Sequence, residues 1–149
     1  MPTAAMLVIG DEILSGRTQD TNTRDVALFL GGLGIALTEA RVVGDDQNAI
    51  IAALNSLRAG HDFVFTSGGI GPTHDDITAD AVAKAFGAGI SHHPDAMALL
   101  AARYAPGDFN VMRQRMARIP HGAALIANPV SAAPGFRIAN VFVLACVPM

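Results

Sequence analysis

The sequence predicts a three-layer α/β/α domain with a mainly parallel sheet, and three observations support this fold class. Patterns typical of buried strands alternate with helical patterns along the first half of the chain. Each of the expected strands there ends in a loop with Gly and Asp or Ser. The 149 residues are 51% apolar, which suits one globular domain with its own core. Strands joined through helices run parallel and carry helices on both faces of the sheet.

The first half of the chain is expected to form strands and helices in alternation. In order they are a buried strand at Ala4–Ile9, a loop over 13–16, a helix over about 22–33, a strand at Ala36–Val43, a helix over 50–57, a strand that begins at Phe63, and a helix at Ala79–Phe86. The helices show apolar residues at helical spacing. Asp20-Thr21, Asp46 and Thr78 stand where N-cap oxygens are needed. The glycine cluster at 31–34 is interpreted as a helix end, where glycine is the usual residue.

The second half is less regular, and shorter elements are expected there. They are a connection over 87–91, a helix over 96–104, a second helix over 109–119, a short strand over 123–126, turns at 128–129 and 133–136, and a last buried strand over 141–147. Pro106-Gly107 ends the first of these helices. Pro134-Gly135 is strong turn chemistry.

The composition argues against several classes of protein. The formal net charge is −3 and no basic run is present, which disfavours nucleic acid and anionic membranes as partners. The single cysteine, Cys146, cannot form an internal disulfide and fits a reducing compartment. No apolar run approaches the roughly 18 residues of a membrane-spanning helix, so a cytoplasmic protein is expected. P-loop, nucleophile-elbow and zinc-ligand patterns are absent from the sequence.

The most informative stretch is a glycine loop, Ser67–Pro72, which follows the third expected strand. Its three glycines allow left-handed backbone angles and leave main-chain N–H groups accessible to a ligand. Free N–H groups near a helix N-terminus favour anions such as phosphate. Asp75 and Asp76 follow the loop and would repel a phosphate. Either a divalent cation or N–H and hydroxyl groups of the ligand would have to offset their charge.

The segment SGGIGPTHDDIT, residues 67–78, resembles the signature loop of the MoaB/MogA-like molybdopterin-binding domain family. Its GPTHDD form is most similar to the competence/damage-inducible CinA branch of that family. Further segments resemble the family in the same order along the chain: Gly10–Glu12 with Ser15-Gly16, Asp20–Asn22, Val43–Asp46, Asn128-Pro129, Ala133–Phe136 and Val147-Pro148. The resemblance implies that residues 1–149 form one domain of this fold. Because the family continues into further helix beyond the position of Met149, a C-terminal element is expected to be missing.

The resemblance also implies a ligand and a set of site residues. The ligand would be molybdopterin or a related phosphorylated pterin or nucleotide. The implied contact residues are Ser67, Gly68, Gly69, Ile70, Gly71, Pro72, Thr73, Gly10, Asp11, Glu12, Pro134 and Gly135. Asp45, Asp75 and Asp76 are the candidate catalytic carboxylates and the candidate ligands of a Mg²⁺ ion. Members of the family form dimers or trimers, so a homo-oligomer is expected.

Two positions separate this chain from the molybdopterin-transferring members of the family, which carry Gly-Gly-Thr-Gly followed by an Arg-Asp pair. Ile70 replaces the threonine, and Asp75 stands at the arginine position. An anion in place of a cation makes the site more negative by two unit charges. ADP-ribose pyrophosphatase activity is associated with the CinA branch, so the resemblance leads to the hypothesis of metal-dependent chemistry on ADP-ribose-like dinucleotides.

Three functions stay open from the sequence: a pterin- or nucleotide-binding domain, a metal-dependent pyrophosphatase, and a structural oligomerisation module. The acids after the strands could instead serve as helix caps. His74 could be a site residue or merely exposed, and Arg113, Arg115 and Arg118 could reach a phosphate or form a solvated helix face. His92-His93 is interpreted as a surface pair, because adjacent side chains need not converge on a metal.

Overall fold

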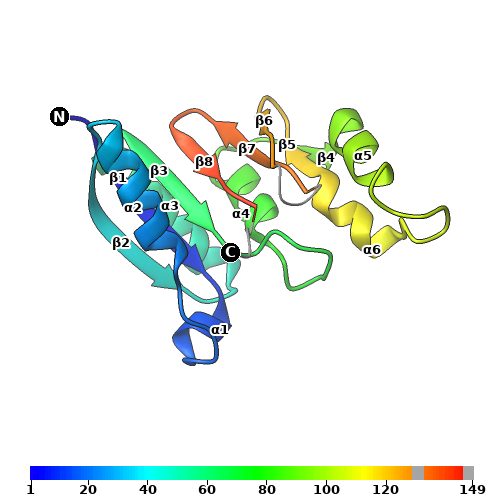
Figure 1. Ribbon diagram of the computed structural model, residues 1–149, viewed down its shortest axis with the longest axis horizontal. Coiled ribbons are helices and arrows are strands. Elements are labelled where there is room, and N and C mark those ends of the chain that lie inside the picture. The colour runs from blue at the N-terminus through cyan, green and yellow to red at the C-terminus, as the bar shows by residue number, and fades with distance from the viewer. Residues whose placement is uncertain (129–132, 146–149) are drawn as a thin grey trace.

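The computed structural model describes residues 1–128 and 133–145 (Figure 1). The strands are β1 (Thr3–Ile9), β2 (Ala36–Val43), β3 (Phe63–Ser67), β4 (Ile90–His92), β5 (Arg118–Pro120), β6 (Ala124–Ile126), β7 (Gly135–Ile138) and β8 (Val141–Val143). The helices are α1 (Asp11–Leu14), α2 (Asn22–Gly32), α3 (Gln47–Gly60), α4 (Thr78–Ala85), α5 (Pro94–Ala101) and α6 (Val111–Gln114), with a 3₁₀ turn, η1, at Arg115–Ala117.

The central sheet has the strand order β2-β1-β3-β8-β7-β6. β2, β1, β3 and β8 run parallel, whereas β7 and β6 add to the edge in antiparallel pairs. β4 and β5 form a separate antiparallel pair. The fold is therefore mixed α/β with a mainly parallel sheet, as the alternating patterns predicted.

Three helices, α2, α3 and α4, cover the two faces of the central sheet, which gives three layers. Ala5, Leu7 and Ile9 of β1 are buried in one core with residues of α3 and α4. Met6 and Val8 point to the opposite face, because side chains alternate along a strand, and both are buried. Figure 1 shows α2 lying over that opposite face, with α3 and α4 behind the sheet. In the part of the chain that the structure describes, no helix has the length and apolar character needed to span a membrane.

Two of the three expected helix caps are confirmed. Asp46 accepts a hydrogen bond from the Ala49 N–H at 2.8 Å and caps α3. Asp20 accepts from the N–H groups of Asn22 and Thr23 at the start of α2. α2 ends as expected in the 31–34 cluster, where Gly34 has a φ of 78° and the left-handed backbone. The prediction for Thr78 is wrong: Ile77 holds the N-cap position of α4, and Thr78 begins the helix with its hydroxyl bonded elsewhere.

Four other expectations need correction, three of them because tertiary pairing overrides local pattern. The loop expected at 13–16 begins inside the single-turn helix α1. The connection expected at 87–91 contains most of β4, which pairs with β5 twenty-six or more residues further along. The helix expected over 109–119 stops at Gln114 and, after the η1 turn, becomes β5 for that same reason. Gly135, expected in a turn, starts β7 and pairs with Ile126 of β6.

The last expectations are confirmed only in outline. The helix expected over 96–104 is α5, which begins two residues earlier at Pro94 and ends at Ala101. The strand expected over 123–126 is β6, and the last buried strand is β8, which ends at Val143. Pro129, Ser131, Cys146 and the Val147-Pro148 segment lie outside the described residues.

Candidate functional site

The glycine loop leaves the carboxyl end of β3 in a conformation that only glycine adopts readily. Gly68 and Gly69 have φ angles of 93° and 72°. A Cβ at Gly68 would lie 1.9 Å from the Ile9 carbonyl oxygen, and one at Gly69 would lie 2.0 Å from the Thr78 Oγ1 atom. These two glycines are therefore required by the protein's own packing, independently of any ligand.

Thr78 holds this loop from the first turn of α4. Its Oγ1 donates to the Gly68 carbonyl at 2.9 Å, and its N–H donates to the Gly69 carbonyl at 3.2 Å. The residue is completely buried, so these bonds do not compete with water. Thr78 thus acts as a clamp on the loop, a role that the capping interpretation missed.

The loop has N–H groups to spare. Its carbonyls at Gly68 and Gly69 are paired, yet the N–H groups of Gly68, Gly69, Ile70 and Gly71 donate to no acceptor among the described residues. Consecutive N–H groups in a glycine-rich turn are suited to anions. The position at the carboxyl end of a parallel strand is also where ligands bind in open α/β sheets.

A pocket of about 400 Å³ opens beside the loop and is named the acidic pocket here. It is lined by Asp11, Glu12, Arg17, Asp45, Gly69, Asp75 and Asp76. These residues come from three separate segments: α1 with the connection that follows it, the turn after β2, and the loop after β3. The parallel sheet order brings the three together, because neighbouring parallel strands end at the same edge.

Asp11 and Asp45 fasten two of these segments to each other. The Asp11 N–H donates to Asp45 Oδ2 at 3.2 Å, and the Asp45 N–H donates to Asp11 Oδ1 at 3.0 Å. Burial raises the pKa of the Asp45 carboxyl above its usual value, and the negative charges of Asp11, Glu12 and Asp76 add to the rise. The N–H of Asp11 opposes the shift without cancelling it. The carboxylates of the acidic pocket therefore interact electrostatically across the three segments.

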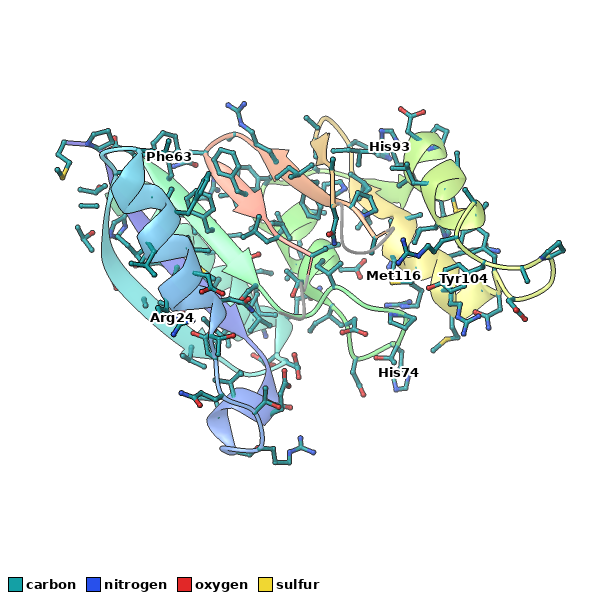
Figure 2. The ribbon with its side chains drawn as sticks, viewed as in Figure 1. Arg24, Phe63, His74, His93, Tyr104 and Met116 are labelled. Atoms are coloured by element: carbon teal, nitrogen blue, oxygen red, sulfur yellow. The ribbon has the colours of Figure 1, made fainter. Side chains whose placement is uncertain are left out.

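Asp76 and Asp75 occupy different environments in the loop. Asp76 is half-buried and accepts from both the N–H and the hydroxyl of Thr73, at 3.0 and 2.9 Å. Asp75 is exposed, with its closest ionic partner His74 at 3.6 Å. Figure 2 shows His74 at the outer end of the loop, and its side chain is 83% exposed. The structure thus favours the interpretation of His74 as a solvent-exposed residue.

The remaining residues implied by the resemblance are spread over three places. Pro72 and Thr73 are exposed on the loop. Gly69, Ile70, Gly71 and Pro134 line a small cavity of about 10 Å³ behind the loop, too small for a ligand. Gly10 lies at the end of β1 beneath Glu12, whose carboxylate a Cβ there would touch. Ser67 and Gly135 line a groove on the α2 face of the sheet instead of the acidic pocket.

That groove is lined mostly by apolar side chains. It has a volume of about 340 Å³ and lies between α2 and the strands β3, β6 and β7. Its lining includes Val26 and Phe29 of α2, Phe65 of β3 and Ile126 of β6. It shares the end of β3 with the glycine loop.

The three arginines that could either reach a phosphate or form a solvated helix face each have a partner within the protein. Arg113 donates to the Asp108 carbonyl at 2.7 Å and lies over the Tyr104 ring. Arg118 forms a paired contact with Asp80 at 2.8 and 2.9 Å. Arg115 Nε donates to the Thr73 carbonyl at 3.2 Å and so supports the loop from η1. Sequence reasoning missed Arg17, whose position in an exposed connection gave no signal.

No preassembled metal site is present in residues 1–128 and 133–145. Asp45, Asp75 and Asp76 line the same pocket, but no three Asp, Glu, His or Cys side chains in these ranges are arranged to hold a metal ion. His92 is exposed in β4, and His93 caps α5 by accepting from the Asp95 N–H at 3.1 Å. The interpretation of the two histidines as surface residues is consistent with both positions.

The fold and the pocket define a small α/β domain with a candidate ligand site at the carboxyl edge of its sheet. Residues 5–149 match the sequence profile of the family described as "Probable molybdopterin binding domain". With relatives that share a third or more of its residues, the chain belongs to this family, in its CinA-like branch.

Several relatives illustrate the relationship. A CinA-like protein of Geobacter metallireducens is 40% identical over 90% of this chain and 33% of its own length. Protein Ta0487 of Thermoplasma acidophilum is 37% identical over 99% of this chain and 59% of its own length. The chain therefore spans about a third of the length of the CinA-like relatives that it matches.

Solved structures agree with this placement. The crystal structure of CinA from Thermoplasma acidophilum, described as a protein with unknown function, matches with a TM-score of 0.89 and 35% identity over 97% of this chain and 88% of that one. The tungsten cofactor synthesizing protein MoaB from Pyrococcus furiosus matches with a TM-score of 0.60 and 22% identity, over 97% of this chain and 82% of its own. The second similarity shows the shared fold.

Proposed function

We propose that this domain binds a phosphorylated pterin or nucleotide, with the phosphate on the glycine loop and the acidic pocket around it. The single observation that carries the proposal is the row of unpaired N–H groups at Gly68–Gly71. The loop is fixed by its packing on Ile9 and Thr78, so its donors would need little ordering when a ligand arrives. Family membership supports a pterin-related ligand.

The charge pattern limits which ligands fit. Five carboxylates line the pocket, so a bare anion would be repelled. A pterin ring brings N–H donors and a nucleotide brings ribose hydroxyls, and both can donate to carboxylate oxygens. The space of about 400 Å³ is in the range of small-molecule sites. The ligand therefore has to combine a phosphate with several donors.

Calorimetry with ADP-ribose, ATP and molybdopterin, each with and without Mg²⁺, tests the proposal. We expect at least one ligand to bind, and Asp76→Ala to weaken that binding about tenfold or more, because Asp76 orders Thr73 and faces the pocket. Asp95→Ala on α5 is the matched control, since Asp95 lies outside the pocket and should leave affinity unchanged. Unchanged isotherms for Asp76→Ala would favour a purely structural module.

A second candidate function is metal-dependent hydrolysis of ADP-ribose-like dinucleotides. The specific observation in its favour is that Asp11, Asp45 and Asp76 line one pocket, where the charges of the other two add to the raised pKa of Asp45. Because the described residues alone form no metal site, the cation would arrive with the diphosphate and be shared between its oxygens and one or two carboxylates. Turnover of ADP-ribose with Mg²⁺ or Mn²⁺ that is lost in Asp76→Asn would support this function. Binding without turnover would leave only the first.

We also propose that the domain self-associates, as the sequence led us to expect. The apolar side chains of Leu28, Phe29 and Leu33 on α2 are 70%, 67% and 62% exposed, which is a surface that a second copy would cover. Light scattering after size-exclusion chromatography should show a dimer or trimer. Phe29→Glu should shift that species toward the monomer, whereas a wild-type monomer at all concentrations would overturn the proposal.

A further inference from the structure

Arg17 is the one basic residue among those that line the acidic pocket in the described part of the chain. It lies in the connection between α1 and α2, which is fixed at both sides of the arginine. The Thr18 N–H donates to the Glu12 carbonyl at 3.1 Å, and the Ser15 hydroxyl donates to the same carbonyl at 3.3 Å. The base of the arginine is therefore held beside the pocket.

The guanidinium of Arg17 is only partly used by the protein. Its Nε donates to Ser15 Oγ at 3.2 Å, and no ion pair involves it in residues 1–128 and 133–145. This is unexpected beside five carboxylates, because Arg41 and Arg118 elsewhere in the fold both pair with acids at 2.7 to 2.9 Å. The two terminal nitrogens of Arg17 are thus available to a ligand, in the fork geometry that suits phosphate oxygens.

The position of Arg17 would offset the repulsion between the pocket's carboxylates and a bound phosphate. Main-chain N–H groups attract a phosphate only through partial charges, whereas the pocket lining carries five carboxylates against one cation. A guanidinium that contacts the phosphate directly lowers this repulsion at the point where it is greatest. The same residue gives no advantage to a ligand without phosphate.

We propose that Arg17 is the specificity-determining residue that contacts the phosphate of the ligand, opposite the N–H groups of Gly68–Gly71. The inference rests on the proposed function and goes beyond it by assigning the preference for phosphate to one side chain. The acidic pocket then has two chemical sides. One side, with Arg17 and the glycine loop, holds the anionic part of the ligand. The other, with Asp11, Asp45 and Asp76, takes hydroxyl or N–H donors.

Titration of the wild-type protein and of Arg17→Gln with AMP and with adenosine tests this inference. We expect Arg17→Gln to weaken AMP binding about tenfold and to leave adenosine binding unchanged, because only AMP carries the phosphate. The loss should shrink as salt is raised from about 0.05 M to about 0.5 M, since the Arg17 side chain is exposed and its charge is screened. Arg17→Lys should recover part of the affinity, as it restores the charge without the fork.

A control variant separates contact with the phosphate from a general effect of a lost charge. Arg24→Ala removes a charge on α2 whose partner is Asp25 (Figure 2). This variant should bind AMP as the wild type does. Equal losses for AMP and adenosine in Arg17→Gln, or no loss at all, would overturn the assignment while leaving the proposed function standing. Failure of the wild-type protein to bind AMP, ADP-ribose, ATP or molybdopterin would overturn both.

Discussion

Two glycine clusters of nearly the same composition have different structural roles in this chain. The first, Gly31, Gly32 and Gly34, ends α2, and a Cβ at any of the three would meet nothing within 4 Å. The second, Gly68, Gly69 and Gly71, follows β3, and a Cβ there would lie 1.9, 2.0 and 2.5 Å from another part of the protein. The first cluster is a replaceable helix end. The second is locked into its surroundings.

The difference shows how a loop can be rigid and still carry free donors. The second cluster is fixed in two ways. Neighbouring atoms pack closely against its glycines where a Cβ would otherwise be, and Thr78 donates hydrogen bonds to two of its carbonyls. Its N–H groups are left without partners among the described residues. Glycine content alone cannot distinguish the two clusters. The packing around each Cα does.

Gly68→Ala should give the largest effect and tests the packing directly. The substitution combines a left-handed φ of 93° with a clash against the Ile9 carbonyl, a backbone atom that cannot move aside. We expect a loss of about 3 kcal/mol or more in the free energy of unfolding, measured in urea. Gly34→Ala is the matched control, because it has a similar φ of 78° in open space and should lose only about 1 kcal/mol. Equal losses at the two positions would remove the distinction between the clusters.

Gly71→Ala should separate ligand binding from stability. Gly71 has no left-handed φ, and the atoms in its way belong to the Asp76 carboxylate, which can move. Moving it breaks the contacts of Asp76 with Thr73, so we expect ligand affinity to fall about tenfold while stability drops by about 1 kcal/mol. Calorimetry and urea unfolding on the same sample would show both. Normal affinity in this variant would contradict the role given to Asp76.

Asp45→Asn should have a smaller effect that depends on pH. Because the pKa of Asp45 is raised in the folded protein, the folded state holds this proton more tightly than the unfolded state. Stability is therefore lost as pH rises from the ordinary Asp range through the raised value, and the full penalty is present at neutral pH. We expect Asp45→Asn to stabilise the protein by about 0.5 kcal/mol at pH 7 and to give no gain near pH 3. An equal gain in stability at pH 7 and near pH 3 would show that the effect does not come from the ionisation of Asp45 beside the neighbouring carboxylates.

Gly31→Ala should also give a small stabilisation, in contrast to the losses expected for Gly68→Ala and Gly71→Ala. The position is inside α2 with open space around it, so alanine removes backbone freedom from the unfolded chain without a clash. We expect a stabilisation of about 0.5 kcal/mol by thermal unfolding and unchanged ligand affinity. A loss of affinity would mean that the first cluster also serves the site.

Much of the fold was predictable because its signals are local. The apolar runs of β1 and β3 and the caps at Asp20 and Asp46 depend on neighbouring residues alone. The β4–β5 pair was not predictable, since Ser91 meets Ile119 only after the chain returns. The same long-range pairing ended the helix that was expected to reach residue 119.

The position of the candidate site could be predicted from the topology, whereas the contacts of its single side chains could not. Acids after β1, β2 and β3 had to meet at one edge of a parallel sheet, and Asp11, Asp45 and Asp76 do line one pocket. No comparable rule predicts which partner a single side chain will contact. Thr78 looked like a cap and is a clamp, and the contribution of Arg17 to the pocket depends on the fold of a connection without pattern.

The most direct measurement follows the backbone amide signals of both glycine clusters by ¹H–¹⁵N NMR while AMP is added. We expect the signals of Gly68, Gly69, Ile70 and Gly71 to shift the most, since their N–H groups are free to bind the phosphate, while those of Gly31, Gly32 and Gly34 stay in place. If AMP binds and the largest shifts fall elsewhere, or if no amide of the glycine loop moves at saturating AMP, then phosphate binding by these N–H groups is contradicted.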